Sequence, residues 1–156
     1  MASSEDLRPY GNPGSDAFRL EAYPFYLLNR VANRYNLAIE AELRKIGIDI
    51  PTWRVLMILG ERQPLAIGQI AKSAVINLST TMRIIERMSD AGLVTTAPSA
   101  QDGRVTEVSL TAKGEDTLAE ARQVTAPLYE KIIRGFSARD FARTLELLNR
   151  LYDNLV

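Results

Sequence analysis

The stretch from residue 67 to residue 114 restricts the possible folds of this chain more than any other part. It opens with apolar residues at helical spacing, which predict a short helix over residues 67–75 with one apolar side. The members of that side are Ile67, Ile70, Ala71 and Ala74. Ile76 and Asn77 then read as a turn, and Asn77 has a side chain suited to cap the next helix.

That second helix is predicted from about Leu78 to Ala91. Four apolar residues at spacings of four, three and three give it an inward stripe, which consists of Leu78, Met82, Ile85 and Met88. Gly92 suits the left-handed conformation that commonly follows a helix end. A helix, a turn and a second helix in this order are typical of a helix-turn-helix.

Two β-prone segments follow the second helix. They span residues 93–97 and 104–110, and the turn-forming residues 98–103 lie between them. Two strands joined by a polar loop directly after such a helix form the wing of a winged helix-turn-helix. The predicted fold class is therefore mainly α, with the winged helix-turn-helix at about residues 51–110.

The outward face of the second helix carries side chains that can bind DNA. Arginine can bind guanine O6 and N7 with two hydrogen bonds, and Ser and Thr can donate to phosphates or base edges. The predicted DNA-binding residues of this helix and its cap are Asn77, Ser79, Thr80, Arg83 and Arg87. The alternative is an ordinary solvated face, because polar outer faces are the norm for globular helices.

The loop of the wing adds two charged residues to this set. Arg104 lies at the edge of the loop and is predicted to enter the adjacent minor groove, where narrow A·T-rich DNA attracts arginine. Asp102 is predicted to hold the Arg104 guanidinium in a bidentate pair before DNA binds. Alternatively, the two residues form a surface pair that contributes little to stability.

The ordered set of these segments resembles a known family. Its parts are residues 78–88 (LSTTMRIIERM), 92–94 (GLV), 102–104 (DGR) and 108–114 (VSLTAKG). The set is similar to that of the multiple-antibiotic-resistance regulator (MarR) family, over roughly residues 20–155, and implies a DNA-binding regulator. The family usually has Arg at the position of Thr96 and often at that of Gly103. This chain therefore has fewer positive charges for phosphates, which predicts modest affinity.

Further helices are predicted on both sides of the winged part. Pro24 fits the first position of a helix that extends to about residue 45, and Pro51 opens a second helix. The core candidates of this second helix are Trp53, Leu56, Met57 and Ile58. Thr111 can cap a long helix to about residue 134, in which Pro127 predicts a kink or break, and Ser137 opens the last helix.

These terminal helices carry more apolar surface than a small winged domain can cover. Burying it against a second copy of the chain across a two-fold axis gives a homodimer. The alternative is a monomer whose helices form a self-contained bundle. The resemblance implies the same, because MarR proteins form homodimers through their first and last helices. The prediction is a flexible arm over residues 1–15 and a single MarR-like domain over 16–156, with dimerisation helices at about 16–46 and 111–156.

Composition excludes several kinds of function. The chain has no Cys and no His, so disulfides, Cys/His zinc sites and histidine-based catalysis are excluded. No phosphate-binding loop or nucleophile elbow is present either, so the chain is predicted to be no enzyme and to need no cofactor. The absence of a long apolar run or signal peptide predicts a cytoplasmic protein without membrane association.

The resemblance also implies a small effector. MarR proteins commonly bind small anions, often aromatic acids, through residues of the first and second helices. The corresponding residues here are Tyr26, Arg30, Arg34, Trp53, Arg54 and Met57. Arginine can pair with a carboxylate, and Tyr and Trp supply flat apolar walls, which suits a small aromatic carboxylate. Packing for Trp53 and Met57, and solvation for the arginines, are the alternatives.

Two functions of different classes follow from these patterns. The first is a homodimeric repressor that binds a pseudo-palindromic operator in double-stranded DNA. Its two recognition helices, the helix of residues 78–91 in each copy, would lie roughly 34 Å apart. A small aromatic acid would release this repressor from the DNA. The second is a winged-helix module that binds protein and no longer binds DNA specifically. The second stays open because the charges between residues 65 and 113 nearly cancel.

Overall fold

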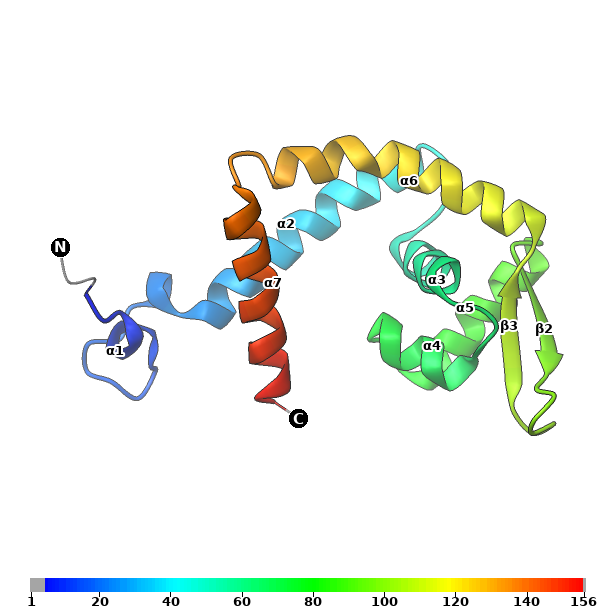
Figure 1. Cartoon of the computed structure of the whole chain (residues 1–156), viewed down its shortest axis with the longest axis horizontal. Helices are drawn as coiled ribbons and strands as arrows, with labels where there is room; N and C mark the ends of the chain where they lie inside the picture. The colour runs from blue at the N-terminus through cyan, green and yellow to red at the C-terminus, as the bar shows by residue number, and fades with distance from the viewer. Residues whose placement is uncertain (1–4, 156) are drawn as a thin grey trace. The chain divides into compact units, whose positions relative to one another are not determined.

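The computed structural model describes residues 5–155 (Figure 1). Helices dominate, and the one sheet within these residues has three strands, so the mainly α fold class is confirmed. The chain forms two compact units with their boundary between Ile50 and Pro51. None of the described helices combines the length and the hydrophobicity that a membrane span requires. The single domain predicted over residues 16–156 and its dimerisation helices stay predictions.

The first unit opens with a short folded segment, α1 (Arg8–Gly11) followed by the 3-10 helix η1 (Leu20–Ala22). The backbone N–H of Arg19 donates to the carbonyl of Tyr10 at 2.8 Å, and the Arg19 guanidinium lies 4.6 Å from the centre of the Tyr10 ring. Residues 8–11 of the predicted flexible arm therefore form a helix, and Tyr10 has a partner that composition does not reveal. The flexible arm itself stays a prediction. Residues 1–4 of the predicted arm, and Val156, lie outside the described residues.

The long helix α2 (Pro24–Arg44) begins at the predicted proline. Gly47, just beyond its end, has a φ of 75°, which a residue with a Cβ adopts only at a cost. Ile39 and Leu43 are buried, whereas several other apolar side chains of α2 are exposed. The exposed ones include Leu27, Val31, Tyr35 and Leu37.

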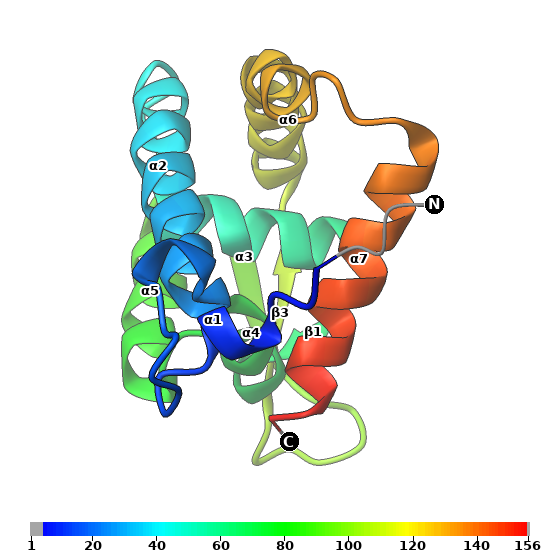
Figure 2. The same ribbon diagram turned by 90° about the vertical axis from the view of Figure 1, so that its left-hand side faces the viewer.

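Helix α3 (Ile50–Glu61) is the first element of the part that we call the winged lobe, residues 51–110. The remaining elements of the lobe are β1 (Leu65–Ala66), α4 (Ile67–Ala74), α5 (Leu78–Asp90), β2 (Val94–Pro98) and β3 (Thr106–Leu110). The strands are antiparallel in the order β1-β3-β2, and both β1 and β3 contact α4 (Figure 2). The winged helix-turn-helix is confirmed. The sequence did not predict β1, because two residues are too few to show alternation.

The core of the winged lobe takes one side from each helix and from the sheet. Its fully buried side chains include Val55, Leu56, Leu59, Ile70, Met88 and Val108. Burying each of the large ones contributes about 1.5–3 kcal/mol relative to leaving it exposed. Met57, a predicted core residue, is instead 37% exposed. Since α3 is apolar on nearly every side, the spacing of its residues does not select the buried face.

Helices α6 (Ala112–Ile132) and α7 (Ala138–Asp153) complete the second unit. Both predicted caps are confirmed: Thr111 Oγ1 accepts from the N–H of Gly114 at 3.0 Å, and Ser137 Oγ accepts from the N–H of Asp140 at 3.1 Å. The Ser137 hydroxyl and N–H donate to the Asp140 carboxylate in return, which lowers the pKa of Asp140. Pro127 does not interrupt α6, because the helix loses only one hydrogen bond there.

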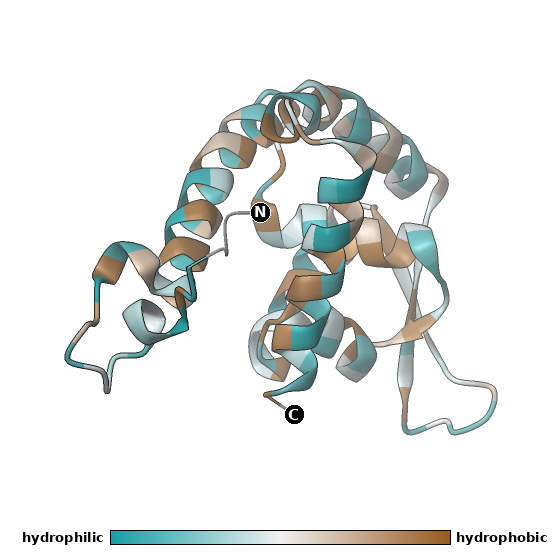
Figure 3. Ribbon diagram, turned by 60° about the vertical axis from the view of Figure 1, so that its left-hand side comes forward, coloured by the Kyte–Doolittle hydropathy of each residue, from teal (hydrophilic) through white to brown (hydrophobic). Residues whose placement is uncertain are grey.

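Helix α7 has an apolar side without a cover. The structure describes all of its residues, and none of them is buried. Leu145, Leu147, Leu148 and Tyr152 are between 41% and 64% exposed. Figure 3 shows brown, hydrophobic bands on this helix, the last one of the described chain. An amphipathic helix with so much exposed apolar surface is typical of a protein–protein interface.

Candidate nucleic-acid interface

The N-terminus of α5 is held by Asn77. Its Oδ1 accepts from the backbone N–H of Thr80 and from the hydroxyl of Ser79, both at 2.8 Å. The predicted cap is therefore confirmed. Because this oxygen is used inside the protein, only the amide N–H groups of Asn77 and the free lone pairs of the Ser79 hydroxyl are left for DNA.

Ser79 and Arg83 lie one above the other on the outward side of α5, because positions four apart share one side of a helix. Arg83 is exposed and forms no hydrogen bond or ion pair with any described residue. All donors of its guanidinium are therefore free to bind a phosphate or a guanine.

Arg87 has different surroundings from Arg83. Its Nη2 donates to Oγ1 of Thr52 on α3 at 3.3 Å, a contact that connects the two helices. Thr80, seven residues before Arg87, is exposed on the same side of α5. The sequence predicted the same DNA-binding role for Arg83 and Arg87. In the structure, however, part of the Arg87 guanidinium is already used for contacts inside the protein, so fewer of its donors are left for DNA.

The buried side of α5 differs from the predicted stripe. It consists of Thr81, Ile84, Ile85 and Met88. Leu78 and Met82 are each 53% exposed, so their assignment to the inward side is wrong. The reason is Thr81, whose hydroxyl donates to the carbonyl of Asn77 at 3.0 Å and can therefore be buried without an unpaired group. A count of apolar residues overlooks it.

The wing loop is shaped by Asp102. Its Oδ1 accepts from the backbone N–H of Arg104 at 3.0 Å, and its carbonyl accepts from the N–H of Val105 at 2.9 Å. The predicted carboxylate–guanidinium pair is absent, because Asp in a turn readily bonds the backbone two residues on. The Arg104 side chain forms no hydrogen bond or ion pair with any residue from 5 to 155. Its guanidinium is therefore free at the wing.

The start of α6 is joined to the turn that follows α5. The N–H of Thr111 donates to the carbonyl of Leu93 at 3.0 Å, and the Thr111 hydroxyl donates to that of Gly92 at 2.6 Å. Gly114 lies so close to Leu93 that a Cβ on it would be 2.0 Å from the Leu93 carbonyl oxygen. These contacts give a physical reason for Thr111 and Gly114 in the motif that follows the wing, and they fix the C-terminal end of α5 relative to α6.

Three of the predicted ligand-binding residues lie on α2. The guanidinium carbon of Arg30 is 5.5 Å from the centre of the Tyr26 ring, within the range of a cation–π contact. Arg34 is exposed one turn further along α2. The structure thus brings Tyr26 and Arg30 together.

The other three predicted ligand-binding residues lie on α3. Trp53 is buried, and Met57, one turn later, is partly exposed. Arg54 Nη1 donates to the carbonyl of Ala74, the last residue of α4, at 3.5 Å. Arg54 therefore has a contact with the end of α4, the helix that precedes α5, and its position in the sequence does not reveal this contact.

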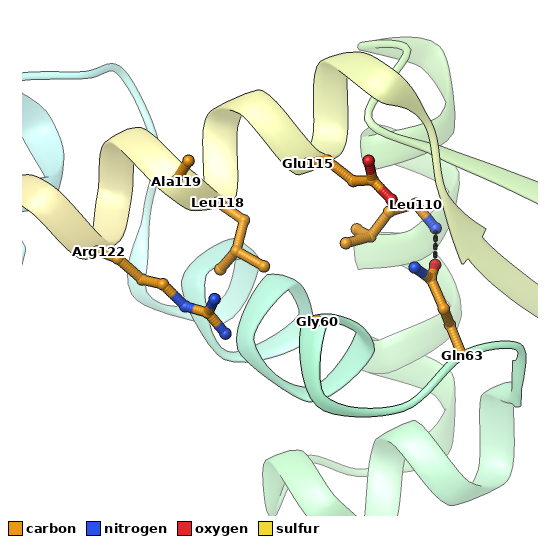
Figure 4. Close-up of a pocket in the computed structure, with 7 residues that line it drawn as sticks. All are labelled: Gly60, Gln63, Leu110, Glu115, Leu118, Ala119 and Arg122. Carbon is orange, nitrogen blue, oxygen red and sulfur yellow. Dashed lines mark hydrogen bonds between the residues drawn. The ribbon is translucent and has the colours of Figure 1, made fainter.

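A separate pocket of about 230 Å³ lies where the end of α3 faces α6 (Figure 4). Its lining residues are Gly60, Gln63, Leu110, Glu115, Leu118, Ala119 and Arg122, which include none of the predicted ligand-binding residues. Small-molecule sites usually have roughly 300–1,000 Å³, so this pocket is smaller than most of them. The described part of the chain has no group of His, Cys, Asp or Glu residues placed to hold a metal ion.

The sequence of the winged lobe matches a known family. Residues 46–105 match the sequence model of the MarR family. The chain is also 41% identical over 144 residues to the HTH-type transcriptional repressor IacR of Pseudomonas putida, and the alignment covers 92% of this chain and 86% of that protein.

Solved structures have the same fold. A MarR family transcriptional regulator from Silicibacter pomeroyi DSS is 27% identical, with a TM-score of 0.81 over 95% of this chain and 97% of that one. The PcaV transcriptional regulator of Streptomyces coelicolor, in complex with its natural ligand, is 21% identical. Its TM-score is 0.74 over 90% of this chain and 99% of that one, a likeness that shows the fold alone.

Proposed function

The chain belongs to the MarR family, and on this premise we propose that it is a homodimeric repressor released from its operator by a small aromatic carboxylate. A role as a DNA-binding repressor of transcription follows from the family and from the 41% sequence identity to a known transcriptional repressor. The dimer, the pseudo-palindromic operator and the class of ligand are the finer parts of the proposal.

The observation that carries this function is the pair of arginines with free guanidinium groups, Arg83 on α5 and Arg104 at the wing. Arg83 suits a guanine edge or a phosphate of the major groove, and Arg104 suits the adjacent minor groove. Ser79 precedes Arg83 by one turn, where its hydroxyl adds a polar contact. Asn77 orders the start of α5, and Asp102 shapes the loop that carries Arg104.

The exposed apolar surface of the terminal helices supports the homodimer. Val31 and Leu37 of α2 are 65% and 60% exposed, and Leu145 of α7 is 49% exposed. A second copy related by a two-fold axis would bury such surfaces on both chains at once. The same axis would present two copies of α5 to successive major grooves, which a pseudo-palindromic operator matches.

The proposed ligand is recognised by charge and by aromatic surface. The guanidinium groups of Arg30, Arg34 and Arg54 can pair with a carboxylate, and Tyr26 and Trp53 can contact an aromatic ring. PcaV, with the same fold, binds a natural ligand. A ligand that binds more tightly to the conformation unable to span both grooves weakens DNA binding by that difference in affinity.

Arg54 offers a route from the ligand to the DNA-binding residues. Its guanidinium donates to the carbonyl at the end of α4, directly before the turn that leads into α5. A carboxylate that pairs with Arg54 would compete for these donors. In this proposal, ligand binding therefore alters a contact that supports the helix-turn-helix.

The experiment that tests this function is fluorescence anisotropy with DNA from immediately upstream of the gene that encodes the chain. Scrambled DNA of the same composition is the control, and salt concentration is varied. We expect sequence-selective binding of one dimer per site, with a modest salt slope because the charges of residues 65–113 nearly cancel. Hydroxybenzoates and hydroxycinnamates added to the complex should lower the anisotropy, and no response to any of them contradicts the proposed ligand class.

A winged-helix module that binds protein is the alternative, favoured by the near-neutral charge and by the uncharged, exposed Thr96 on β2. Elution from a heparin column separates the two functions, because a DNA-binding dimer is retained at low salt and a protein-binding module is not. The cytoplasmic location of the chain stays a prediction.

A further inference from the structure

The start of α5, the helix that the proposed function places in the major groove, exposes three apolar side chains. Val75, in the turn before α5, is 86% exposed, and Leu78 and Met82 are each 53% exposed. Leu78 and Met82 are four residues apart and so form a short row on one side of α5. This row runs beside the row formed by Ser79 and Arg83. We refer to Val75, Leu78 and Met82 as the apolar row.

The fold of the winged lobe does not account for the apolar row. The core side of α5 is already filled by Thr81, Ile85 and their neighbours. Val75 has a φ of 57°, a left-handed conformation that is a genuine outlier for a β-branched residue. Glycine or asparagine usually occupies this position after a helix. A strained residue that is also exposed suggests that its side chain has a partner outside the chain.

The neighbours of the apolar row indicate which partner this is. Ser79 and Arg83 border it, and the proposed function places these residues in the major groove. Leu78 and Met82 lie in the N-terminal half of α5, the part of a recognition helix that approaches base edges. The only apolar group that base pairs present in the major groove is the C5-methyl of thymine.

We propose that Leu78 and Met82, supported by Val75, contact thymine methyl groups and so make thymines part of the operator sequence. This inference rests on the proposed function. It adds a means of distinguishing thymine from cytosine and from uracil that the arginines do not provide. A protein surface as the partner of the apolar row is the other outcome of the test.

Deoxyuridine provides the test, because it pairs like thymidine and lacks only the methyl group. The full-length chain first selects its preferred duplexes from a random library. Each thymine of the selected site is then replaced singly by deoxyuridine, and affinity is measured by fluorescence anisotropy. We expect the unaltered protein to lose about fourfold in affinity at one or two positions of each half-site, the effect of removing one buried methyl group.

Substitutions in the apolar row complete the test. At one such position, the Leu78→Ala protein and the Met82→Ala protein should each have the same affinity for the thymidine duplex as for the deoxyuridine duplex. That affinity should equal the affinity of the unaltered protein for the deoxyuridine duplex. Met82→Leu is the matched control, because it keeps an apolar side chain and should keep the preference for thymidine. Both residues are exposed, so the melting temperatures of all variants should equal that of the unaltered protein.

Three results would overturn the inference, and they differ in what else they affect. Selective DNA binding that is indifferent to every methyl group refutes the apolar contact and leaves the proposed function standing. Alanine variants that weaken binding to both duplexes equally show that the row only positions α5 or binds another protein. If the library yields no preferred sequence, both the proposed function and this inference fail.

Discussion

Gly114 provides a direct test of how the winged lobe is fixed to α6. A Cβ at this position would lie 2.0 Å from the carbonyl oxygen of Leu93 and 3.1 Å from its carbonyl carbon. Ordinary van der Waals contact begins at 3.4 Å, so Gly114→Ala requires the start of α6 to move away by about 1.4 Å. The obstacle is backbone, which cannot turn aside as a flexible side chain can.

The magnitude follows from the contacts that such a movement would disturb. The Thr111 N–H bonds the Leu93 carbonyl at 3.0 Å, and the Lys113 ammonium bonds the carbonyl of Ala91 at 2.8 Å. Overpacking costs about 1–3 kcal/mol, and each lost hydrogen bond costs about 0.5–1.5 kcal/mol. The better helix propensity of alanine offsets roughly 0.5–1 kcal/mol of this loss. The expected net loss in free energy of unfolding is about 2–4 kcal/mol.

Urea unfolding followed by circular dichroism measures this loss at a fixed protomer concentration, because the stability of a dimer depends on concentration. The melting temperature should fall by roughly 5–15 °C. Gly68→Ala is the matched control, since Gly68 lies in helix α4 and a Cβ there meets nothing within 4 Å. We expect this control to be unchanged or up to about 1 kcal/mol more stable.

Equal stabilities for the two alanine variants would refute the reasoning. They would show that the start of α6 can move without cost, and that the close approach to Leu93 does not require glycine at position 114. A loss in Gly114→Ala with an unchanged control supports the contact as the reason.

Three further predictions concern DNA binding and the helix caps. Arg83→Ala should weaken DNA binding by about 1–3 kcal/mol and relax the base preference at one position of each half-site. Fluorescence anisotropy with single-base variants of the operator measures both effects. An equal loss of affinity on all sequences would identify a phosphate contact instead. Arg104→Ala should weaken binding mainly at sites with A·T-rich flanks, whereas equal losses at all flanks in the same assay would contradict the minor-groove contact. The lowered pKa of Asp140 means that its carboxylate stabilises the fold at pH values above the ordinary pKa of 3.8, and that this contribution is lost as the pH falls through the lowered pKa. Asp140→Asn should remove this part of the pH dependence of stability, which acid unfolding followed by circular dichroism measures. Identical unfolding curves for both proteins would count against this role of Asp140.

Some features of this protein depend on a few neighbouring residues, and the sequence alone determined them. The caps at Asn77, Thr111 and Ser137 were predictable, because each side chain bonds a backbone N–H only three residues away. The left-handed Gly92 and the wing that follows it were predictable for the same reason, since turn and strand preferences act over a few residues.

Other features depend on which elements meet, and only the tertiary structure decided them. Thr81 is buried and Met82 is exposed, because packing against other elements buries the side of α5 that carries Thr81. The bond from its hydroxyl to the Asn77 carbonyl only makes that burial tolerable. Arg87 contacts Thr52, which is 35 residues away, so no local pattern separates it from Arg83. Local spacing shows which side chains share a helix face. Which face is buried, and which guanidinium stays free for DNA, is decided by contacts between residues far apart in the sequence.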